Sequence, residues 1–334
     1  MSKIIKIRNK SVGKGQPVFI IAEAASNHNQ NLTQAKELID IAFECGVDAV
    51  KFQLFKADEL YKKSNPMFKI MKNNEFPREW LRALYKYAEK KGFIFLASPF
   101  DLKAIDLLVK IGSPALKLAS SETTNLRLLR YAASKKKPLL ISTGMCNIAD
   151  IYEAVEVAKS VGNQDVALLH CTSLYPAKPS HVNLLAMDTL YAAFDLPVGY
   201  SDHTLGIGVP IAAAARGACI VEKHFTLSKK LKGPDHFYAL EPKQLKEMVI
   251  AIREVEQSIG SAIKKMLPGE EKLARRSSLI AKNNIPKGAK LTKDMIIIDR
   301  PALGIKPRFL EAVIGQKTKR DIKKGTPVTW EIVG

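Results

Sequence analysis

Residues 198–225 read VGYSDHTLGIGVPIAAAARGACIVEKHF, and this stretch decides the fold. It opens with a short apolar run that ends at Asp202, passes through a helical pattern at Ile207–Arg216, and closes with a second apolar run at Ile220–Phe225. Nearly continuous apolar runs that are separated by amphipathic helices are typical of parallel strands buried on both faces. The stretch therefore predicts a strand–helix–strand unit.

The same alternation extends over most of the chain. The eight apolar runs are Val18–Glu23, Ala49–Gln53, Phe93–Ser98, Leu116–Ser120, Leu139–Thr143, Val166–Thr172, Val198–Asp202 and Ile220–Phe225. Helical patterns lie between them, as at Thr33–Cys45 and Pro77–Lys91. Eight such units close a (β/α)8 TIM barrel. A doubly wound open sheet is the alternative, but it would usually carry a Gly-rich phosphate turn after an early strand, and the first run leads instead into Glu23-Ala24-Ala25-Ser26-Asn27-His28.

The C-terminal part of the chain has a different pattern. A linker at 264–276 follows the last long helical stretch, and short β-like runs alternate with turns from 277 to 334. Two phrases resemble each other, NIPKG at 284–288 and DIKKG at 321–325. We therefore predict an α/β catalytic barrel at 1–263, followed by a small β-rich domain at 277–334 with an internal pseudo-repeat.

Composition and charge limit the classes of function. The chain has 334 residues, 46% apolar and 25% charged, which is typical of globular proteins. Its net charge is +19, and residues 261–334 hold 17 Lys/Arg against 7 Asp/Glu. Nucleic-acid binding by this basic tail is weakly supported, because its only aromatic residues are Phe309 and Trp330; attraction of anionic substrates is the alternative. The absence of a membrane-spanning run or a signal-peptide pattern predicts a cytoplasmic protein.

Polar and ionisable residues end the predicted strands. They are Glu23, Lys51 with Gln53, Ser98, Lys117 through Glu122, Ser142, His170 through Ser173, Ser201 through His203, and Glu222 through His224. A barrel's active site is built at the carboxyl ends of its strands. Strand termination alone explains Ser and Thr well, but Lys, Glu and His are rarely buried unless they are paired or functional. We therefore expect the active site there.

Two histidines are candidate metal ligands. His203 and His224 end neighbouring strands, and two imidazoles without Cys would leave open positions for substrate oxygens on a divalent ion. Asp202 or Glu222 could orient the rings. The alternative is two histidines that are hydrogen-bonded in a polar pocket.

The lysines and the glutamates at the strand ends each have two possible roles. Lys51 and Lys117, with the serines around them, suit a phosphate and a carboxylate, although a barrel lysine can instead form a Schiff base. Glu23 and Glu122 could act as general acid or base or as permanent ion-pair partners. Asp235 lies in a Gly-Pro-containing loop after the last strand and could accept hydrogen bonds from sugar hydroxyls.

Taken together, these phrases resemble the sialic acid synthase family over nearly the whole chain. The matching motifs are Ile20–Glu23 with Asn27–Asn29, Lys51–Gln53, Ser98–Phe100, Lys117–Glu122, Ser142–Met145, His170–Ser173 with Tyr175–Pro176, Gly199–Thr204, Glu222–Phe225 and Gly233–His236, and the tail from Arg276 to Pro301 resembles the family's antifreeze-like (SAF) domain. The resemblance implies an N-acetylneuraminate synthase, which condenses phosphoenolpyruvate with the open-chain aldehyde of N-acetylmannosamine and releases phosphate.

The resemblance also implies the roles of residues. A divalent metal, Mn²⁺ in the first place and otherwise Mg²⁺ or Co²⁺, would bind His203 and His224. The expected phosphoenolpyruvate ligands are Lys51, Ser98, Lys117, Ser120, Ser142, Ser173 and Ser201. The expected sugar ligands are Gln53, Tyr175, Asp235 and Arg300, with Glu23 and Glu122 as catalytic carboxylates. Arg300 would come from the partner subunit of a homodimer that exchanges its small domains.

Two departures from the family pattern leave the sugar open. The family commonly has Asn at the position of Ser173 and Gly at the position of Ala302. A legionaminate synthase is therefore an alternative, and a pseudaminate synthase is a weaker one. Rivals from other classes are a metal-dependent or Schiff-base aldolase and a polyanion or nucleic-acid binder that uses the basic tail.

Overall fold

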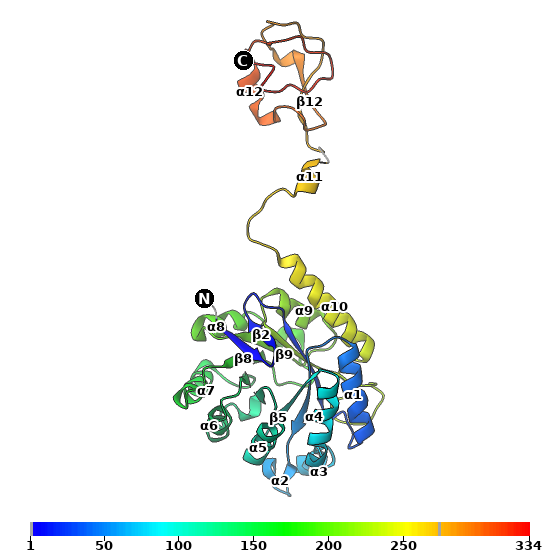
Figure 1. Cartoon of the computed structure of the whole chain (residues 1–334), viewed down its shortest axis with the longest axis vertical. Helices are drawn as coiled ribbons and strands as arrows, with labels where there is room; N and C mark the ends of the chain where they lie inside the picture. The colour runs from blue at the N-terminus through cyan, green and yellow to red at the C-terminus, as the bar shows by residue number, and fades with distance from the viewer. Residues whose placement is uncertain (1–2, 273–274) are drawn as a thin grey trace. The chain divides into compact units, whose positions relative to one another are not determined.

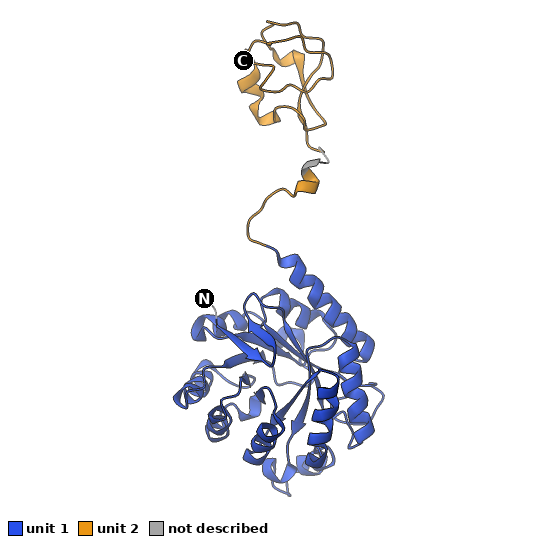
Figure 2. Ribbon diagram, viewed as in Figure 1, with its two compact units in different colours: residues 1–260 blue, residues 261–334 orange. Residues whose placement is uncertain are grey.

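The computed structural model describes residues 3–272 and 275–334. Two compact units divide the chain, one ending at Gly260 and the other beginning at Ser261 (Figure 2). Each unit has its own hydrophobic core. No helix in the described ranges is both long and apolar enough to cross a membrane.

The first unit is an eight-stranded parallel barrel, which confirms the predicted fold (Figure 1). Its strands are β3 (Phe19–Ala25), β4 (Ala49–Leu54), β5 (Ile94–Pro99), β6 (Leu116–Leu118), β7 (Leu139–Ser142), β8 (Val166–Cys171), β9 (Val198–Asp202) and β10 (Ile220–His224). Hydrogen bonds join them in the order β5-β4-β3-β10-β9-β8-β7-β6. The end strands β5 and β6 lie side by side, so the sheet nearly closes.

Helices connect the strands and cover the outside of the barrel. They are α1 (Leu32–Glu44), α2 (Ala57–Leu60), α3 (Pro66–Asn73), α4 (Leu81–Lys90), α5 (Leu102–Ile111), α6 (Leu126–Ser134), α7 (Ile148–Ser160), α8 (Ala186–Phe194), α9 (Gly208–Ala215) and α10 (Pro242–Ile259). Side-chain caps mark several starts: Asn31, Asp101 and Asn147 each accept hydrogen bonds from the first turn of the following helix. These caps satisfy backbone N–H groups that have no partner within the helix.

The alternation of side chains along each strand separates two apolar layers. On β3, Ile20 and Ala22 face the helices, whereas Phe19 and Ile21 belong to a cluster inside the barrel. An N-terminal hairpin, β1 (Ile4–Ile7) and β2 (Lys10–Gly13), contributes Ile5, Ile7 and Val12 to this inner cluster. The sequence did not predict the hairpin, because four-residue strands carry too little periodicity to stand out.

The same alternation decides which polar side chains at the ends of β9 and β10 face the barrel interior and which face outward. Glu222 and His224 share one face of β10 with the inner Ile220, whereas Lys223 shares the outer face with Val221. Lys223 is buried and forms an ion pair with Asp202 of β9, and its ammonium also donates to the Thr204 carbonyl. A buried ion pair on the outer face of the sheet therefore links β9 and β10.

The second unit is a small β-rich fold in which the two predicted repeats pair with each other. Strands β11 (Ser278–Ala281) and β12 (Ile296–Asp299) are antiparallel, and the short helices α11 (Pro268–Lys272) and α12 (Leu310–Val313) complete the regular elements. Ile285 and Ile322 exchange two backbone hydrogen bonds of 2.8 Å. Reciprocal caps flank them: the Lys287 N–H donates to Asp321 at 2.7 Å, and the Lys324 N–H donates to Asn284 at 2.8 Å.

Replacement of Gly199 by alanine tests how closely β9 and β10 approach. A Cβ at Gly199 would lie 2.6 Å from Ile220 Cβ and 2.7 Å from the Ile220 carbonyl oxygen. Because the backbone of β10 must shift, we expect Gly199→Ala to cost about 1–3 kcal/mol of stability in chemical denaturation. Gly208→Ala is the matched control, since nothing lies within 4 Å of its Cβ position. Equal stability of the two variants would contradict the close approach.

Candidate active site at the carboxyl ends of the barrel strands

Four buried charges meet at the carboxyl ends of β3, β4, β6 and β10. Lys51 of β4 forms an ion pair with Glu23 of β3 and lies 3.5 Å from Glu222 Oε1. Lys117 of β6 lies 3.2 Å from the same Glu222 oxygen. All four residues are at most 5% exposed. Glu222 thus links two lysines that come from separate strands, and the site holds two ammonium groups beside two carboxylates.

The two carboxylates differ in their affinity for protons. Burial raises the pKa of Glu23, and the neighbouring Lys51 offsets only part of this effect. Burial also acts on Glu222, but the ammonium groups of Lys117 and Lys51 lower the pKa of that carboxyl below its ordinary value. Carboxyl groups whose environments separate their pKa values are suited to different roles in acid–base chemistry.

The two lysines differ in the same way. Burial lowers the pKa of Lys117. The pKa of Lys51 is raised, because Glu222 and Glu23 outweigh the effect of its burial. Lys51 is therefore the more firmly protonated of the two cations.

Hydroxyl groups surround these charges. Lys51 Nζ donates to Ser98 Oγ at 3.0 Å, and Ser201 Oγ donates to Glu222 at 3.3 Å. Ser120 Oγ accepts from the Gly144 N–H at 3.0 Å, and Ser173 Oγ lies where a side chain on Gly144 would project. The structure thus brings four of the predicted serines to the strand ends.

Two buried polar atoms in this group lack partners. Ser142 Oγ and Glu222 Oε2 have no hydrogen-bond partner among the described residues. Buried polar groups in proteins are nearly always satisfied. The Ser142 hydroxyl can donate a hydrogen bond, so beside two buried lysines it suits an oxygen-rich ligand, whereas Glu222 Oε2 can only accept one.

The two predicted metal ligands lie next to each other. The rings of His203 and His224 are 5.3 Å apart between centroids, and both side chains are buried. The Nδ1 atom of His203 lies 2.8 Å from the Thr172 carbonyl oxygen, and that of His224 lies 3.4 Å from the Tyr238 hydroxyl. Burial keeps the pKa of His224 well below its ordinary value, so this imidazole is neutral, as a metal ligand must be.

The arrangement fits a metal that shares its coordination with a substrate. Within residues 3–272 and 275–334, no group of three or more His, Cys, Asp and Glu side chains could hold an ion. The two histidines alone would leave the other coordination positions to water or substrate oxygens, and they are one protein ligand fewer than a catalytic zinc site usually has. Their Nδ1 atoms already have partners, so the Nε2 atoms remain for an ion.

The residues predicted to contact the sugar make hydrogen bonds or ring contacts with different parts of the site. Gln53 donates to Glu23 at 3.1 Å, and the half-exposed Tyr175 ring lies 4.1 Å from the His203 ring. Asp235 accepts from the Tyr238 hydroxyl at 2.8 Å. The Glu122 carboxylate is hydrogen-bonded within its own turn, to Ser121 at 3.2 Å and Asn125 at 3.1 Å.

Arg300 belongs to the second unit, at the end of β12. It is exposed, and its backbone N–H donates to the Asp299 carboxylate at 2.8 Å. The role expected for Arg300 at a barrel mouth stays a prediction.

Several residues of this region were assigned differently from sequence or were missed. Asp202 or Glu222 was a candidate to orient the histidine rings, but each binds lysine: Glu222 in the central group, and Asp202 through Lys223. The two-residue spacing of Glu222 and His224 on one strand was the signal that both face inward. Tyr238 was missed, because a tyrosine in a long loop carries no periodic signal.

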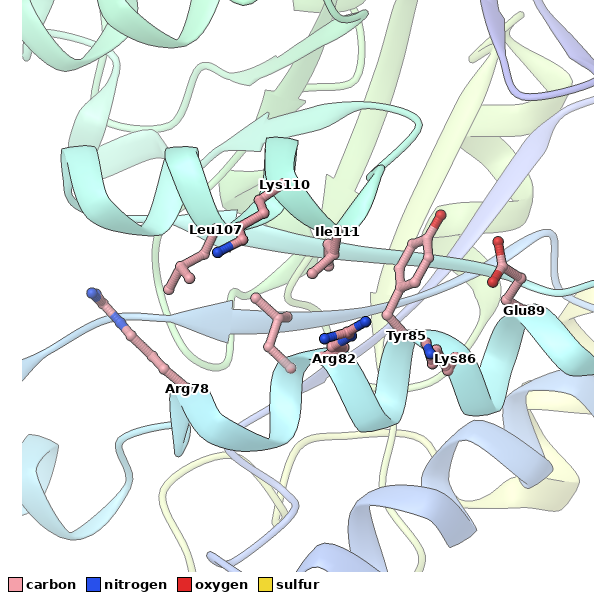
Figure 3. A pocket seen from close by; sticks show the side chains of 9 residues that line it. Arg78, Arg82, Tyr85, Lys86, Glu89, Leu107, Lys110 and Ile111 are labelled. Carbon is pink, nitrogen blue, oxygen red and sulfur yellow. The ribbon is translucent and has the colours of Figure 1, made fainter.

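A separate cavity of about 440 Å³ lies between α4 and α5 (Figure 3). The residues around it are Arg78, Leu81, Arg82, Tyr85, Lys86, Glu89, Leu107, Lys110 and Ile111. None of the residues predicted for catalysis or binding lines it. The candidate site is therefore the group of charges and histidines at the strand ends.

Comparison with known proteins identifies the family of the chain. The model of the NeuB family matches residues 38–264, and the model of the SAF domain matches residues 276–333. The chain is 43% identical to an uncharacterised protein of Methanocaldococcus jannaschii, over 98% of both chains. It is 41% identical to the N,N'-diacetyllegionaminic acid synthase of Legionella pneumophila, over 96% of both chains.

A solved structure extends the likeness to three dimensions. The N-acetylneuraminic acid (sialic acid) synthetase of Leptospira borgpetersenii, crystallised with citrate, superposes with a TM-score of 0.78 at 34% identity. The match covers 82% of this chain and 95% of that chain.

Amide substitutions at the two central carboxylates should differ in cost. Glu222→Gln leaves Lys51 and Lys117 with less compensation, and breaking a buried ion pair typically costs about 3–5 kcal/mol. Glu23→Gln should cost less, because burial already raises the pKa of Glu23 and so favours its neutral form. Denaturant titration of the two variants measures the difference. A larger loss for Glu23→Gln would contradict this assignment of charge.

Proposed function

Because the chain belongs to the NeuB family, we propose that it is a synthase that condenses phosphoenolpyruvate with the open-chain aldehyde of an N-acetylated hexosamine. The product would be a nine-carbon keto acid, with release of phosphate. The observation that carries the proposal is the position of Lys51 and Lys117, two buried ammonium groups from separate strands that share Glu222 Oε1 at 3.5 and 3.2 Å.

Phosphoenolpyruvate carries a phosphate and a carboxylate, and both need cations in a water-poor site. Lys51 and Lys117 can supply those charges, and Ser98, Ser120, Ser142, Ser173 and Ser201 can supply hydroxyl donors. Ser142 Oγ supports this proposal, since it is buried without a partner among the described residues. Cations that are already held in place lose little entropy when the anion binds.

His203 and His224 are the residues that would hold a divalent ion, Mn²⁺ in the first place. Such an ion, when bound, would polarise the aldehyde oxygen of the sugar. The protein's own contribution is to keep the rings adjacent and to engage their Nδ1 atoms, so that the Nε2 atoms stay available. The buried pair of Lys223 and Asp202 supports this role, because it fixes the strands that carry both rings.

Proton movements are assigned to the carboxylates. The methylene carbon of phosphoenolpyruvate attacks the aldehyde carbon, whose oxygen takes up a proton, and water then adds to the cationic carbon that bears the phosphate. Loss of a proton from this water and of phosphate from the same carbon gives the keto acid. Glu23 is the proposed base for that water, because its raised pKa gives it a stronger affinity for a proton than an ordinary carboxylate has. Glu122 is assigned to the sugar side, together with Gln53, Tyr175 and Asp235.

The sugar proposed from the sequence motifs is N-acetylmannosamine, which would make the product N-acetylneuraminate. A diacetamido hexose is the second candidate, because the Legionella relative at 41% identity is named for a diacetylated acid. A Schiff-base aldolase is less well supported. Lys51 is held as an ammonium by two carboxylates, and only Lys117, whose pKa burial lowers, resembles a nucleophilic amine.

Phosphate release tests the proposed function. We expect the wild-type protein to release phosphate from phosphoenolpyruvate only when an N-acetylated hexosamine is present and to lose this activity with a chelator. A panel containing N-acetylmannosamine and diacetamido hexoses identifies the sugar. Glu23→Gln and His224→Ala should each lower turnover by orders of magnitude while circular dichroism stays unchanged. Cleavage that needs no phosphoenolpyruvate, with borohydride trapping on Lys117, would support the aldolase instead.

Mixing two inactive variants tests whether Arg300 acts on a partner subunit. Arg300→Ala has an intact barrel, and His224→Ala has an intact small domain. If the domains are exchanged in a homodimer, co-refolding the variants should restore about a quarter of wild-type turnover, since half the dimers would contain one complete site. Each variant refolded alone is the control. Absence of recovery in a mixture that forms heterodimers would contradict the exchange.

A further inference from the structure

Tyr238 is a buried residue that the proposed mechanism does not use. Its side chain is 2% exposed, and its hydroxyl lies between two residues of the site. The hydroxyl donates to Asp235 Oδ1 at 2.8 Å and lies 3.4 Å from His224 Nδ1. The Tyr238 and His224 rings are 5.2 Å apart between centroids. One hydroxyl group therefore connects a predicted sugar ligand with a predicted metal ligand.

The backbone after β10 holds Tyr238 in this position. The chain leaves the barrel after Phe225 and returns at Leu240, whose N–H donates to the His224 carbonyl at 2.9 Å. The Thr226 N–H donates to the Leu240 carbonyl at 2.9 Å, so the two ends of the loop are paired. Since Tyr238 comes two residues before Leu240, its ring is brought back against the strand end that carries His224.

A second contact anchors the middle of the loop. His236 lies 2.6 Å from Thr226 Oγ1 through Nδ1 and 3.1 Å from Asn29 Oδ1 through Nε2. The adjacent Gly233 leaves no room for a side chain, because a Cβ there would lie 2.7 Å from the His236 ring. Asp235 and Tyr238 are thus on a loop that is tied to both the last strand and the first βα connection.

The hydrogen-bonding capacity of the groups decides where the protons lie. A tyrosine hydroxyl has one proton and keeps it at neutral pH, whereas an ionised carboxylate only accepts. The Tyr238 hydroxyl donates a hydrogen bond to Asp235 Oδ1 at 2.8 Å, so its oxygen is left to accept from His224. An N–H on His224 Nδ1 is the group that this oxygen can accept from, and in the tautomer with that N–H the unprotonated nitrogen is Nε2.

His203 reaches the same state through a different acceptor. Its Nδ1 lies 2.8 Å from the Thr172 carbonyl oxygen, which can only accept a hydrogen bond. Each ring then has a partner for a proton on Nδ1, and in the neutral form of that tautomer Nε2 is the free nitrogen. Metal-binding histidines commonly have their tautomer set by such an outer partner. Thr172 provides it for one ring, and Tyr238 is the only group that does so for the other in the described ranges.

We infer that Tyr238 is a positioning residue that fixes the Nδ1-protonated tautomer of His224 and couples this ring to the sugar-binding loop through Asp235. The inference rests on the proposed function, in which His224 Nε2 binds the divalent ion and Asp235 contacts the sugar. Loss of the Tyr238 hydroxyl would free both partners at once, so ion binding and sugar binding should weaken together.

Tyr238→Phe tests this inference, because it keeps the ring and removes only the hydroxyl. In metal-free protein labelled with ¹⁵N-histidine, we expect wild-type His224 to show the Nδ1–H tautomer and the variant to show a mixture. The signals are assigned by their loss in His224→Asn. Binding of Mn²⁺ alone, followed by electron paramagnetic resonance, should weaken about 10–100-fold, as for other outer partners of metal ligands. The KM for the sugar should also rise.

Tyr87→Phe is the matched control. The Tyr87 hydroxyl also bonds to a carboxylate, Asp40, at 2.9 Å, but it lies on α4 among the outer helices. This variant loses the same type of hydrogen bond and should keep the wild-type tautomer and Mn²⁺ affinity. A general loss of stability would affect both variants alike.

The outcomes separate the inference from the proposed function. If wild-type His224 is protonated on Nε2, or if Tyr238→Phe changes neither the tautomer nor the Mn²⁺ affinity, the inference is wrong. If the wild-type protein binds no Mn²⁺, the proposed metal site fails, and the tautomer measurement still decides whether Tyr238 orients the ring. A tautomer change with weaker Mn²⁺ binding supports both.

Discussion

Glu222 is the residue on which the polar interior of this barrel depends. One of its oxygens lies 3.2 Å from Lys117 and 3.5 Å from Lys51, and Lys51 is also paired with Glu23. Removing a single ion from water costs several kcal/mol even after relaxation, so none of these charges could be buried alone. Buried together, they keep two ammonium groups dehydrated and in place before any anionic substrate arrives. The carboxylates offset the free-energy cost of burying the lysines. The lysines in turn can bind phosphate and carboxylate groups.

The two faces of β9 and β10 carry different residues: one face contributes to the site, and the other holds the strands together. Glu222 and His224 face the interior, while Lys223 on the opposite face is paired with Asp202 of the neighbouring strand. The outer pair joins the strand ends that carry His203 and His224, so the separation of the two rings is set by the scaffold. A metal ion would then bind to histidines that the protein already holds close together.

The distribution of the residues explains why the family indicates the type of reaction more clearly than the sugar. The lysines, the histidines and Glu23 lie on barrel strands or at their ends, where neighbouring strands constrain them. The predicted sugar ligands Tyr175 and Asp235 lie on loops, and Arg300 lies in the second unit. Loops tolerate change while the scaffold remains the same. Related enzymes can therefore share one reaction and differ in substrate.

The sequence by itself determined the barrel, the small second unit and the set of ionisable residues at the strand ends. Those features are local, because a strand, a helix and the residue that ends each strand are all visible within one short stretch. Only the tertiary structure decided the pairing. It placed Glu222 rather than Glu122 between the lysines, and it brought Tyr238 of the last loop against His224. Such contacts depend on the register between strands and on how a loop returns to the sheet, and neither is encoded in the periodicity of any single segment.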